Sequence, residues 1–347
     1  MTTEVIISIF AKLGELMRAV GKGSVWPGFQ SGITEDEYNT LIDTVHAVRH
    51  KNNWFTEDYV RMAFESWGHL LTEENLSEWV SNYKIGKCSK KVGVVMAGNL
   101  PLVGFHDLLS VAISNQVALV KMSSQDNQLL PRLVQILFNY CPGLKERIQL
   151  VDVLEGFDAV IATGSNNSSR YFEAYFKHVP NIIRKNRTSI GIVKLKSTDD
   201  EILNLGKDIF SYYGLGCRSV TKVFFEQGFD LDRFFNGIYS YNPIANMNKY
   251  VSNYEYHKAL FLMNSEKFLD NGFLILRENK DDFSPIGVLH YEYYSSEKSL
   301  AEELKTRKDH IQCVVSDQHV PYGKSQAPHI DEYADGVDTL KFLTGLG

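Results

Sequence analysis

The chain has 347 residues, of which 36 are basic, 42 are acidic and 44% are hydrophobic. At roughly 150 residues per domain, this length predicts two domains, or one large domain, with a substantial core. A charged fraction of 22%, with 20 Phe and 18 Tyr, excludes the intrinsically disordered classes. The formal net charge of -6 argues against a general nucleic-acid surface or an anionic-membrane surface.

The cysteines are too few and too dispersed for a disulfide scaffold. Cys88, Cys141, Cys217 and Cys313 form no C-x-x-C pair and no H-E-x-x-H accompanies them, so we expect no metal site. The longest nearly apolar run, residues 92–105, is too short to span a bilayer. We therefore expect a reduced, cytoplasmic protein without a membrane span.

The pattern of residues 1–85 is helical, and Thr34 with Glu37 forms a capping box ahead of one apolar face. From residue 90, short apolar runs alternate with helical stretches. The pattern predicts strands over residues 91–98, 116–123, 148–153, 157–164 and 188–195, and helices over residues 102–115, 127–139 and 167–177. Short apolar strands separated by helices are typical of a parallel sheet with crossover helices. The sequence therefore predicts an α/β fold with a doubly wound parallel sheet.

A second capping box, Thr198 with Glu201, begins a helix that Gly214 and Gly216 end, and Cys217 follows directly. Beyond this point the pattern predicts strands over residues 219–226, 273–276 and 311–316 and helices over residues 231–240 and 296–307. The change in pattern places a domain boundary near residues 190–200.

Polar residues follow the predicted strands, at the edge where a doubly wound sheet binds ligands. Residues 98–101 bring an amide, residues 121–124 a lysine, and residues 163–168 a hydroxyl-rich glycine turn at a helix start. The helix after the fifth strand delivers the thiol of Cys217. Neither G-x-G-x-x-G nor G-x-x-x-x-G-K-[ST] accompanies a strand, which excludes the usual dinucleotide fingerprint and a P-loop.

Seven short segments, in chain order, resemble the aldehyde dehydrogenase superfamily and specifically its acyl-CoA reductase branch, the LuxC-like fatty acyl reductases. They are GNLP (98–101), ALVKMSS (118–124), ATGS (162–165), RKNRTSI (184–190), GLGCRS (214–219), FSPIGV (283–288) and PYGKSQAP (321–328). The resemblance covers about residues 90–340. It implies an aldehyde-dehydrogenase-like fold, with a doubly wound cofactor domain and a smaller α/β catalytic domain.

The resemblance also implies a division of the chain. Residues 1–195 would hold the helical N-terminal region and a Rossmann-like cofactor-binding domain. Residues 196–320 would form the catalytic domain, and residues 321–347 a C-terminal segment that packs back near the site.

In this family, Cys217 would be the nucleophile, because a thiolate attacks a thioester carbonyl readily and forms an acyl-enzyme. Asn99 would be the oxyanion donor, together with the backbone N–H of Cys217. The alternatives that the residues themselves leave open are a buried structural thiol and an asparagine that satisfies a turn.

Lys121, Ser123 and Ser124 match the family's site for the adenosine ribose. NAD-linked hydrolytic relatives place a Glu at about the position of Ser124, where its carboxylate repels a 2′-phosphate. The serine removes that repulsion and Lys121 adds positive charge. We therefore expect NADPH to be the cofactor, with NADH as the alternative.

Thr163, Gly164 and Ser165 would lie under the cofactor pyrophosphate at a helix start, where unpaired N–H groups attract anions. Phe283 matches the family's nicotinamide-side motif. The Glu that normally precedes this Phe is missing, and Asp281 or Asp282 would have to replace it.

The departure from hydrolytic relatives lies at residues 186–189. Those relatives carry Glu-Leu-Gly-Gly about thirty residues before the nucleophile, and that Glu activates water. This chain has Asn-Arg-Thr-Ser instead. Without a general base, hydrolysis of an acyl-enzyme should be slow, which leaves thiol exchange or hydride transfer.

The expected function is NADPH-dependent reduction of a fatty acyl thioester, acyl-CoA or another carrier, to the aldehyde through an acyl-cysteine. Two alternatives remain: a CoA-acylating aldehyde dehydrogenase that runs in reverse, and a non-catalytic subunit of a multienzyme complex that binds an acyl group or a nucleotide. The expected protein partners are acyl-transferase and synthetase subunits and a second copy of the chain. We do not expect nucleic acid as a partner.

Overall fold

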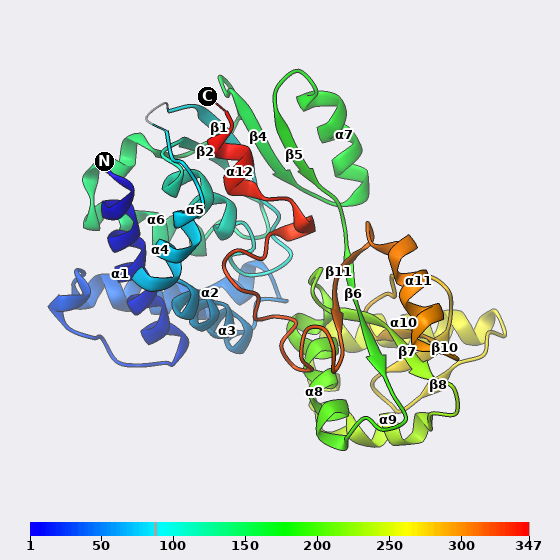
Figure 1. The fold of residues 1–347 in the computed structure, drawn as a ribbon. Helices are drawn as coiled ribbons and strands as arrows, with labels where there is room; N and C mark the ends of the chain where they lie inside the picture. The colour runs from blue at the N-terminus through cyan, green and yellow to red at the C-terminus, as the bar shows by residue number, and fades with distance from the viewer. Residues whose placement is uncertain (87–88, 347) are drawn as a thin grey trace. The chain divides into compact units, whose positions relative to one another are not determined.

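The computed structural model describes residues 1–86 and 89–346, so Cys88 lies outside the described residues. The described chain forms two compact units, each with its own sheet (Figure 1). Unit 1 comprises residues 1–185 and 329–347, and unit 2 comprises residues 186–328. Within the described ranges, no helix combines the length and the apolar character needed to cross a bilayer.

Unit 1 begins with four helices: α1 (Thr3–Gly21), α2 (Glu35–Lys51), α3 (Glu57–Leu70) and α4 (Glu73–Ser81). The predicted capping box starts α2, because the Thr34 hydroxyl accepts from the Glu37 N–H and the Glu37 carboxylate accepts from the Thr34 N–H. Helices α1 and α3 approach so closely that a Cβ at Gly68 would lie 2.6 Å from the backbone nitrogen of Arg18. Glycine permits this approach.

The sheet of unit 1 is fully parallel and has the order β3-β2-β1-β4-β5. Its strands are β1 (Lys91–Val95), β2 (Val117–Lys121), β3 (Ile148–Leu150), β4 (Ala159–Thr163) and β5 (Asn181–Arg184), and its helices are α5 (Phe105–Ile113), α6 (Leu129–Tyr140) and α7 (Asn166–Phe176). Alternate side chains enter two different cores. Val92 and Val94 join the core of α1–α6, whereas Val160 and Ala162 join the core that α7 covers. Both faces are therefore covered, as in a doubly wound sheet.

The C-terminal residues of unit 1 return to its sheet as α12 (Thr339–Thr344), the red helix of Figure 1, which packs against α5. Arg184 at the end of β5 donates to the Asp107 carboxylate on α5 (2.5 Å) and to the Thr339 hydroxyl (3.0 Å). All three side chains are buried. One guanidinium therefore links β5, α5 and α12.

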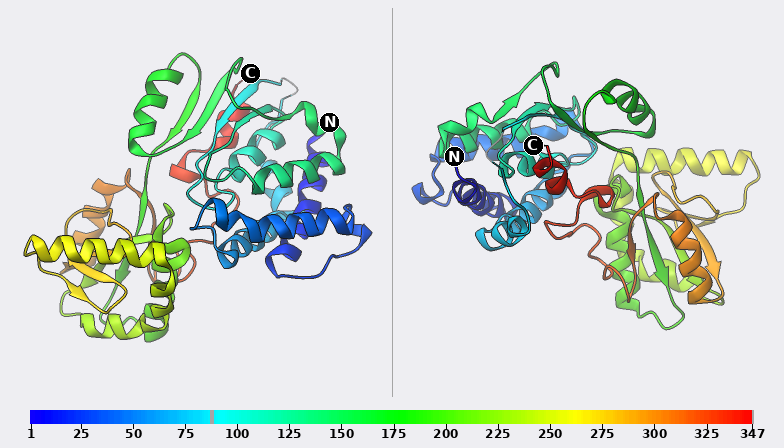
Figure 2. Two further views of the ribbon diagram at one scale, coloured as in Figure 1. Left: turned by 180° about the vertical axis from the view of Figure 1, so that it is seen from behind. Right: turned by 45° about the horizontal axis from the view of Figure 1, so that its top comes forward.

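Unit 2 contains a mixed sheet with the order β11-β6-β7-β10-β9-β8, in which only β8 is antiparallel to its neighbour. Its elements are β6 (Thr188–Val193), α8 (Asp199–Phe210), β7 (Val220–Glu226), α9 (Leu231–Gly237), α10 (Asn248–Met263), β8 (Leu269–Asp270), β9 (Ile275–Glu278), β10 (Val288–Tyr294), α11 (Glu297–Arg307) and β11 (Ile311–Val315). Helix α10, yellow in Figure 2, packs Tyr254 and Phe261 onto Ile275 of β9 and Val288 of β10. The predicted α/β class is confirmed.

The sheets divide the chain at a different point from the predicted residue 195. The predicted strand 188–195 is β6, which pairs with β7 and β11 in the second sheet. The first sheet ends instead with β5, which the sequence pattern did not reveal. A strand that is buried along its whole length, as β6 is, carries no pattern that tells which sheet it joins. The predicted C-terminal segment also divides, because residues 321–328 belong to unit 2.

Replacing Arg184 by Met should lower the free energy of unfolding by about 3–5 kcal/mol, because the buried Asp107 carboxylate loses its cation. Chemical denaturation followed by circular dichroism measures the change. Lys185→Met is the matched control: this neighbouring side chain is exposed, and its pair with Glu173 (2.7 Å) lies at the surface. Its loss should cost less than about 1 kcal/mol. Equal losses in the two variants would contradict the assignment.

Candidate active site

The carboxyl ends of β1 and β4 lie next to each other where the strand order of unit 1 reverses. From β1 the chain continues to α5, and from β4 it continues to α7 on the opposite face. The two loops therefore diverge, and this switch point is where open α/β sheets bind ligands. Asn99 follows β1 and is exposed, and Thr163 ends β4. The structure thus places Asn99 in the loop after β1 and Thr163 at the end of the adjacent strand β4.

The loops after β1 and β2 are held together by buried contacts. A Cβ at Gly98 would collide with the Ser123 side chain, so glycine lets the two loops meet. Asp126 accepts a hydrogen bond from the N–H of Leu102 (3.0 Å), whose φ of 58° is left-handed. Burial raises the pKa of Asp126 to about 6. The other Asp126 oxygen, Oδ1, is buried without a hydrogen-bond partner among the described residues.

Lys121 ends β2 and Ser124 lies three residues further on, and both side chains are exposed. In the part of the chain that the structure describes, neither side chain has an ion pair or a hydrogen bond. Ser123, by contrast, accepts from the N–H of Gln125 (3.2 Å). The residues fit a phosphorylated ribose, since an unpaired ammonium faces solvent beside an exposed hydroxyl and no carboxylate stands at residues 121–124.

Residues 163–165 lead directly into α7. Ser165 caps the helix by accepting from the Ser168 N–H (3.2 Å). A Cβ at Gly164 would lie 2.8 Å from Phe172 and 2.9 Å from Ser168, so this turn admits only glycine without rearrangement. The backbone at the start of α7 is therefore close to solvent and suited to an anion.

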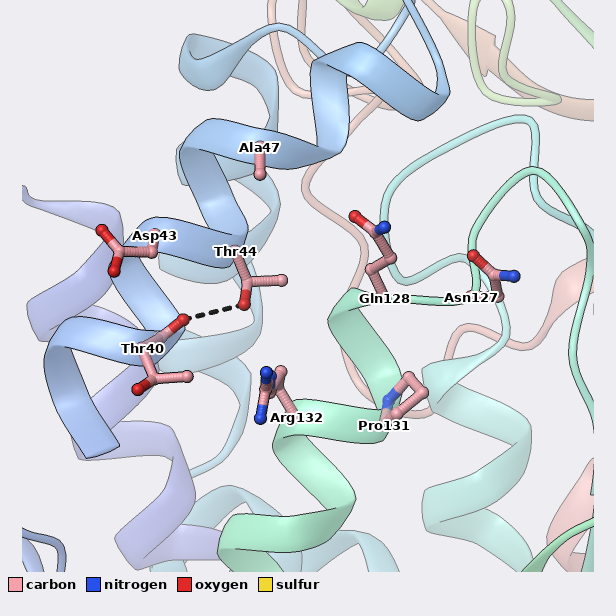
Figure 3. A pocket seen from close by; sticks show the side chains of 8 residues that line it. All are labelled: Thr40, Asp43, Thr44, Ala47, Asn127, Gln128, Pro131 and Arg132. Carbon is pink, nitrogen blue, oxygen red and sulfur yellow. Dashed lines mark hydrogen bonds between the residues drawn. The ribbon is translucent and has the colours of Figure 1, made fainter. Parts of the chain in front are cut away.

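A groove of about 580 Å³ lies beside these loops, between α2 and the start of α6 (Figure 3). The sequence analysis missed it, because its two walls are far apart in the chain. Its lining residues are Thr40, Asp43, Thr44, Ala47, Asn127, Gln128, Pro131 and Arg132. Most of these residues have polar side chains.

In unit 2, Cys217 lies at the exposed tip of a turn. The Ser219 N–H donates to the Gly216 carbonyl (2.9 Å) and the Gly216 N–H donates to the Ser219 hydroxyl (3.2 Å), which makes Cys217 the first central residue of a β-turn. Tyr212 and Tyr213 before it have φ angles of 53° and 58°. Left-handed backbone at non-glycine residues costs of order 1 kcal/mol each and is concentrated at functional sites.

Side chains of β6 hold this turn. Ser189 donates to the Cys217 carbonyl (3.0 Å). The hydroxyls of Thr188 and of Thr221 on β7 form a hydrogen bond with each other (2.5 Å). The Thr221 hydroxyl also donates to the carbonyl of Asp282 (2.7 Å). In unit 2, residues 188–189 of RKNRTSI therefore contact the turn of GLGCRS and, through Thr221, the residue that precedes FSPIGV, although these segments are far apart in the sequence.

The segment PYGKSQAP joins the same group. Asp208 of α8, buried, accepts from the N–H groups of Gly323 (2.6 Å) and Ser325 (2.9 Å). Burial raises the pKa of Asp208, and these two N–H groups oppose that shift. The segment then reaches the nucleophile turn, because Arg218 donates to the Ser325 carbonyl (3.2 Å).

Phe283 is 40% exposed, and its ring packs near that of His310 (6.4 Å between centroids). Asp282 is buried and pairs with Arg307 (2.6 Å), so its carboxylate already has a cation. Asp281 is exposed. Of the two carboxylates considered for the second ribose, only that of Asp281 is at the surface.

Sequence reasoning missed Ser189, Asp126 and Asp208. Each contacts a residue distant in the chain, and none stands in a spacing that signals chemistry. Ser189 had one signal, its place in the segment where hydrolytic relatives have Glu-Leu-Gly-Gly. In the described ranges, no group of three or more His, Cys, Asp or Glu side chains is placed to hold a metal ion.

Comparisons with known proteins concern the family and the fold. Residues 70–238 match the family described as acyl-CoA reductase (LuxC). A search of curated proteins finds no match.

Solved structures resemble the whole chain. Aldehyde dehydrogenase 21 from Physcomitrella patens, in complex with its reaction product succinate, has a TM-score of 0.62 at 14% identity, over 98% of this chain and 87% of that one. An NADP-dependent enzyme of E. coli has a TM-score of 0.62 at 11% identity, over 91% and 73% of the two chains. An indole-3-acetaldehyde dehydrogenase complexed with NAD+ has a TM-score of 0.57 at 10% identity, over 89% and 71%.

Identities this low establish the fold alone, whereas the match over residues 70–238 concerns the family. The resemblance that the sequence predicted is confirmed by both findings. The chain is an oxidoreductase of aldehyde-dehydrogenase-like fold, and its residues 70–238 match the acyl-CoA reductase (LuxC) family.

Proposed function

We propose that this protein reduces a fatty acyl thioester such as acyl-CoA to the aldehyde, with NADPH and through a covalent acyl group on Cys217. One observation carries the proposal. Cys217 is exposed at the tip of a turn, and the β6 side chains that hold this turn carry hydroxyl groups and no carboxylate. All the proposed site residues except Phe283 lie within the segment that matches the acyl-CoA reductase family.

The first step is transfer of the acyl group to the enzyme. The Cys217 thiolate attacks the thioester carbonyl carbon, the new C–S bond forms, and the bond to CoA breaks as the CoA thiolate leaves. The side-chain amide of Asn99 and the backbone N–H of Cys217 would stabilise the oxyanion of the tetrahedral intermediate. The product of this step is again a thioester, so little energy is lost.

The fate of the acyl-enzyme decides the function. Hydrolysis needs a base that removes a proton from water, and residues 186–189 offer an amide, a guanidinium and two hydroxyls. The hydroxyls of Thr188 and Ser189 are engaged in hydrogen bonds. This arrangement favours reduction over release of a free acid.

The residues of unit 1 would hold the cofactor. Lys121, Ser123 and Ser124 would bind the adenosine ribose and its 2′-phosphate, and Thr163, Gly164 and Ser165 would lie under the pyrophosphate. In unit 2, Phe283 would contact the nicotinamide side. NADPH, when bound, supplies the hydride that reduces the acyl-cysteine. Collapse of the resulting thiohemiacetal anion would break the C–S bond, return the Cys217 thiolate and release the aldehyde.

Cys217→Ala should abolish aldehyde formation from acyl-CoA and NADPH, with a fall in kcat of at least about 1,000-fold, because alanine has no thiol to take the acyl chain. Cofactor absorbance and aldehyde trapping measure the loss. Cys141→Ala, a half-buried cysteine of unit 1, is the matched control and should keep wild-type activity. Retained aldehyde production in Cys217→Ala would refute the proposal.

Ser124→Glu should shift the preference from NADPH toward NADH. The new carboxylate repels a 2′-phosphate and accepts the ribose hydroxyls, which should lower the NADPH/NADH ratio of kcat/KM by about ten-fold or more, of order 1.4 kcal/mol. Gln125→Glu, also exposed, adds the same charge one residue further on and should have a smaller effect. An unchanged ratio in Ser124→Glu would count against NADPH binding at this loop.

A further inference from the structure

Cys313 is a second thiol that the structure places close to the nucleophile turn. It lies on β11, the strand that pairs with β6, and the register between them shifts between Ile311 and Val314. Irregularities of this kind turn a side chain away from its regular direction and are common beside active sites. Here the Sγ of Cys313 lies 3.0 Å from the Ser189 hydroxyl.

The hydrogen bonds of Ser189 determine the direction of this contact. A hydroxyl has one proton to donate and can accept two hydrogen bonds. Ser189 donates its proton to the Cys217 carbonyl (3.0 Å), which can only accept, and it accepts from the backbone N–H of Cys313 (3.3 Å). The Cys313 thiol must then donate its proton to the second lone pair of the Ser189 oxygen. This hydrogen bond requires the protonated form of Cys313.

We propose that Cys313 and Ser189 are positioning residues for the nucleophile. The Cys313 thiol and N–H fix the Ser189 hydroxyl, and the hydroxyl fixes the carbonyl of Cys217 and with it the turn from Gly216 to Ser219. Neither residue exchanges atoms with the substrate. The effect of this arrangement on catalysis rests on the function proposed above, whereas its effect on the turn does not.

The physical argument lies in what Ser189 would do without the thiol. An acceptor of two hydrogen bonds is confined to one rotamer, because both donors come from β11. With one donor lost, the hydroxyl is freer to rotate away from the Cys217 carbonyl. The turn then samples more orientations, and the thiolate is less often aligned for attack on the thioester.

Four variants test the proposal: Cys313→Val, which removes the donor and stays apolar; Cys313→Ser, which restores a donor; Ser189→Ala; and the double variant Ser189→Ala/Cys313→Val. Cys313→Ala serves if valine prevents folding. The first readout is deuterium uptake by peptides covering residues 214–219, compared with peptides from α10 in the same unit. The second is the separate determination of kcat and KM for acyl-CoA.

In Cys313→Val, amide exchange at residues 214–219 should quicken and kcat should fall, each by about five-fold, the size expected for loss of one net hydrogen bond. KM and exchange in α10 should not change, and Cys313→Ser should return both readouts to within about two-fold of wild type. The double variant should be no worse than Ser189→Ala, since the thiol acts through the hydroxyl.

Three results would overturn the proposal: wild-type behaviour of Cys313→Val, additive effects in the double variant, or quicker exchange throughout unit 2, which would indicate a merely structural role. If the wild-type protein shows no acyl-CoA reduction, the proposed function fails. The exchange measurements still decide whether Cys313 and Ser189 hold the turn.

Discussion

The hydrogen bond from Ser189 to the carbonyl of Cys217 is the contact on which the candidate site of unit 2 depends. A nucleophile at the tip of a turn is exposed and reactive, but a turn is also easily deformed. The neighbouring β6–β7 pair supplies rigidity through Ser189 and Thr188, and the strained residues Tyr212 and Tyr213 precede the tip. The sheet therefore fixes an otherwise mobile group, in agreement with the rule that functional groups are held most accurately by regular elements.

The same strand explains the direction of the proposed chemistry. The hydroxyls of β6 are engaged in hydrogen bonds, that of Ser189 with the Cys217 carbonyl and that of Thr188 with Thr221, and residues 186–189 include no carboxylate. In the proposed mechanism, an acyl-enzyme at Cys217 would therefore lack a nearby base for hydrolysis and would be left for hydride transfer.

The sequence predicted the α/β class, the doubly wound sheet and the order of the motifs, because apolar periodicity and glycine turns are local properties. It did not reveal β5, α10 or β10, nor that β6 joins the second sheet, because the choice of sheet is a tertiary property. For the candidate site, motif order predicted Cys217 and Asn99. It did not predict the contacts of Ser189, Cys313 and Asp126, since each of these contacts is made with a residue distant in the chain.

The acyl group on Cys217 is the central claim, and it can be detected directly. The protein is incubated with a long-chain acyl-CoA without any nicotinamide cofactor, then digested and examined by mass spectrometry. The account predicts release of CoA and a stable acyl mass on the peptide that contains Cys217. Absence of that mass, or an acyl group on Cys141 or Cys313 in its place, would contradict the account.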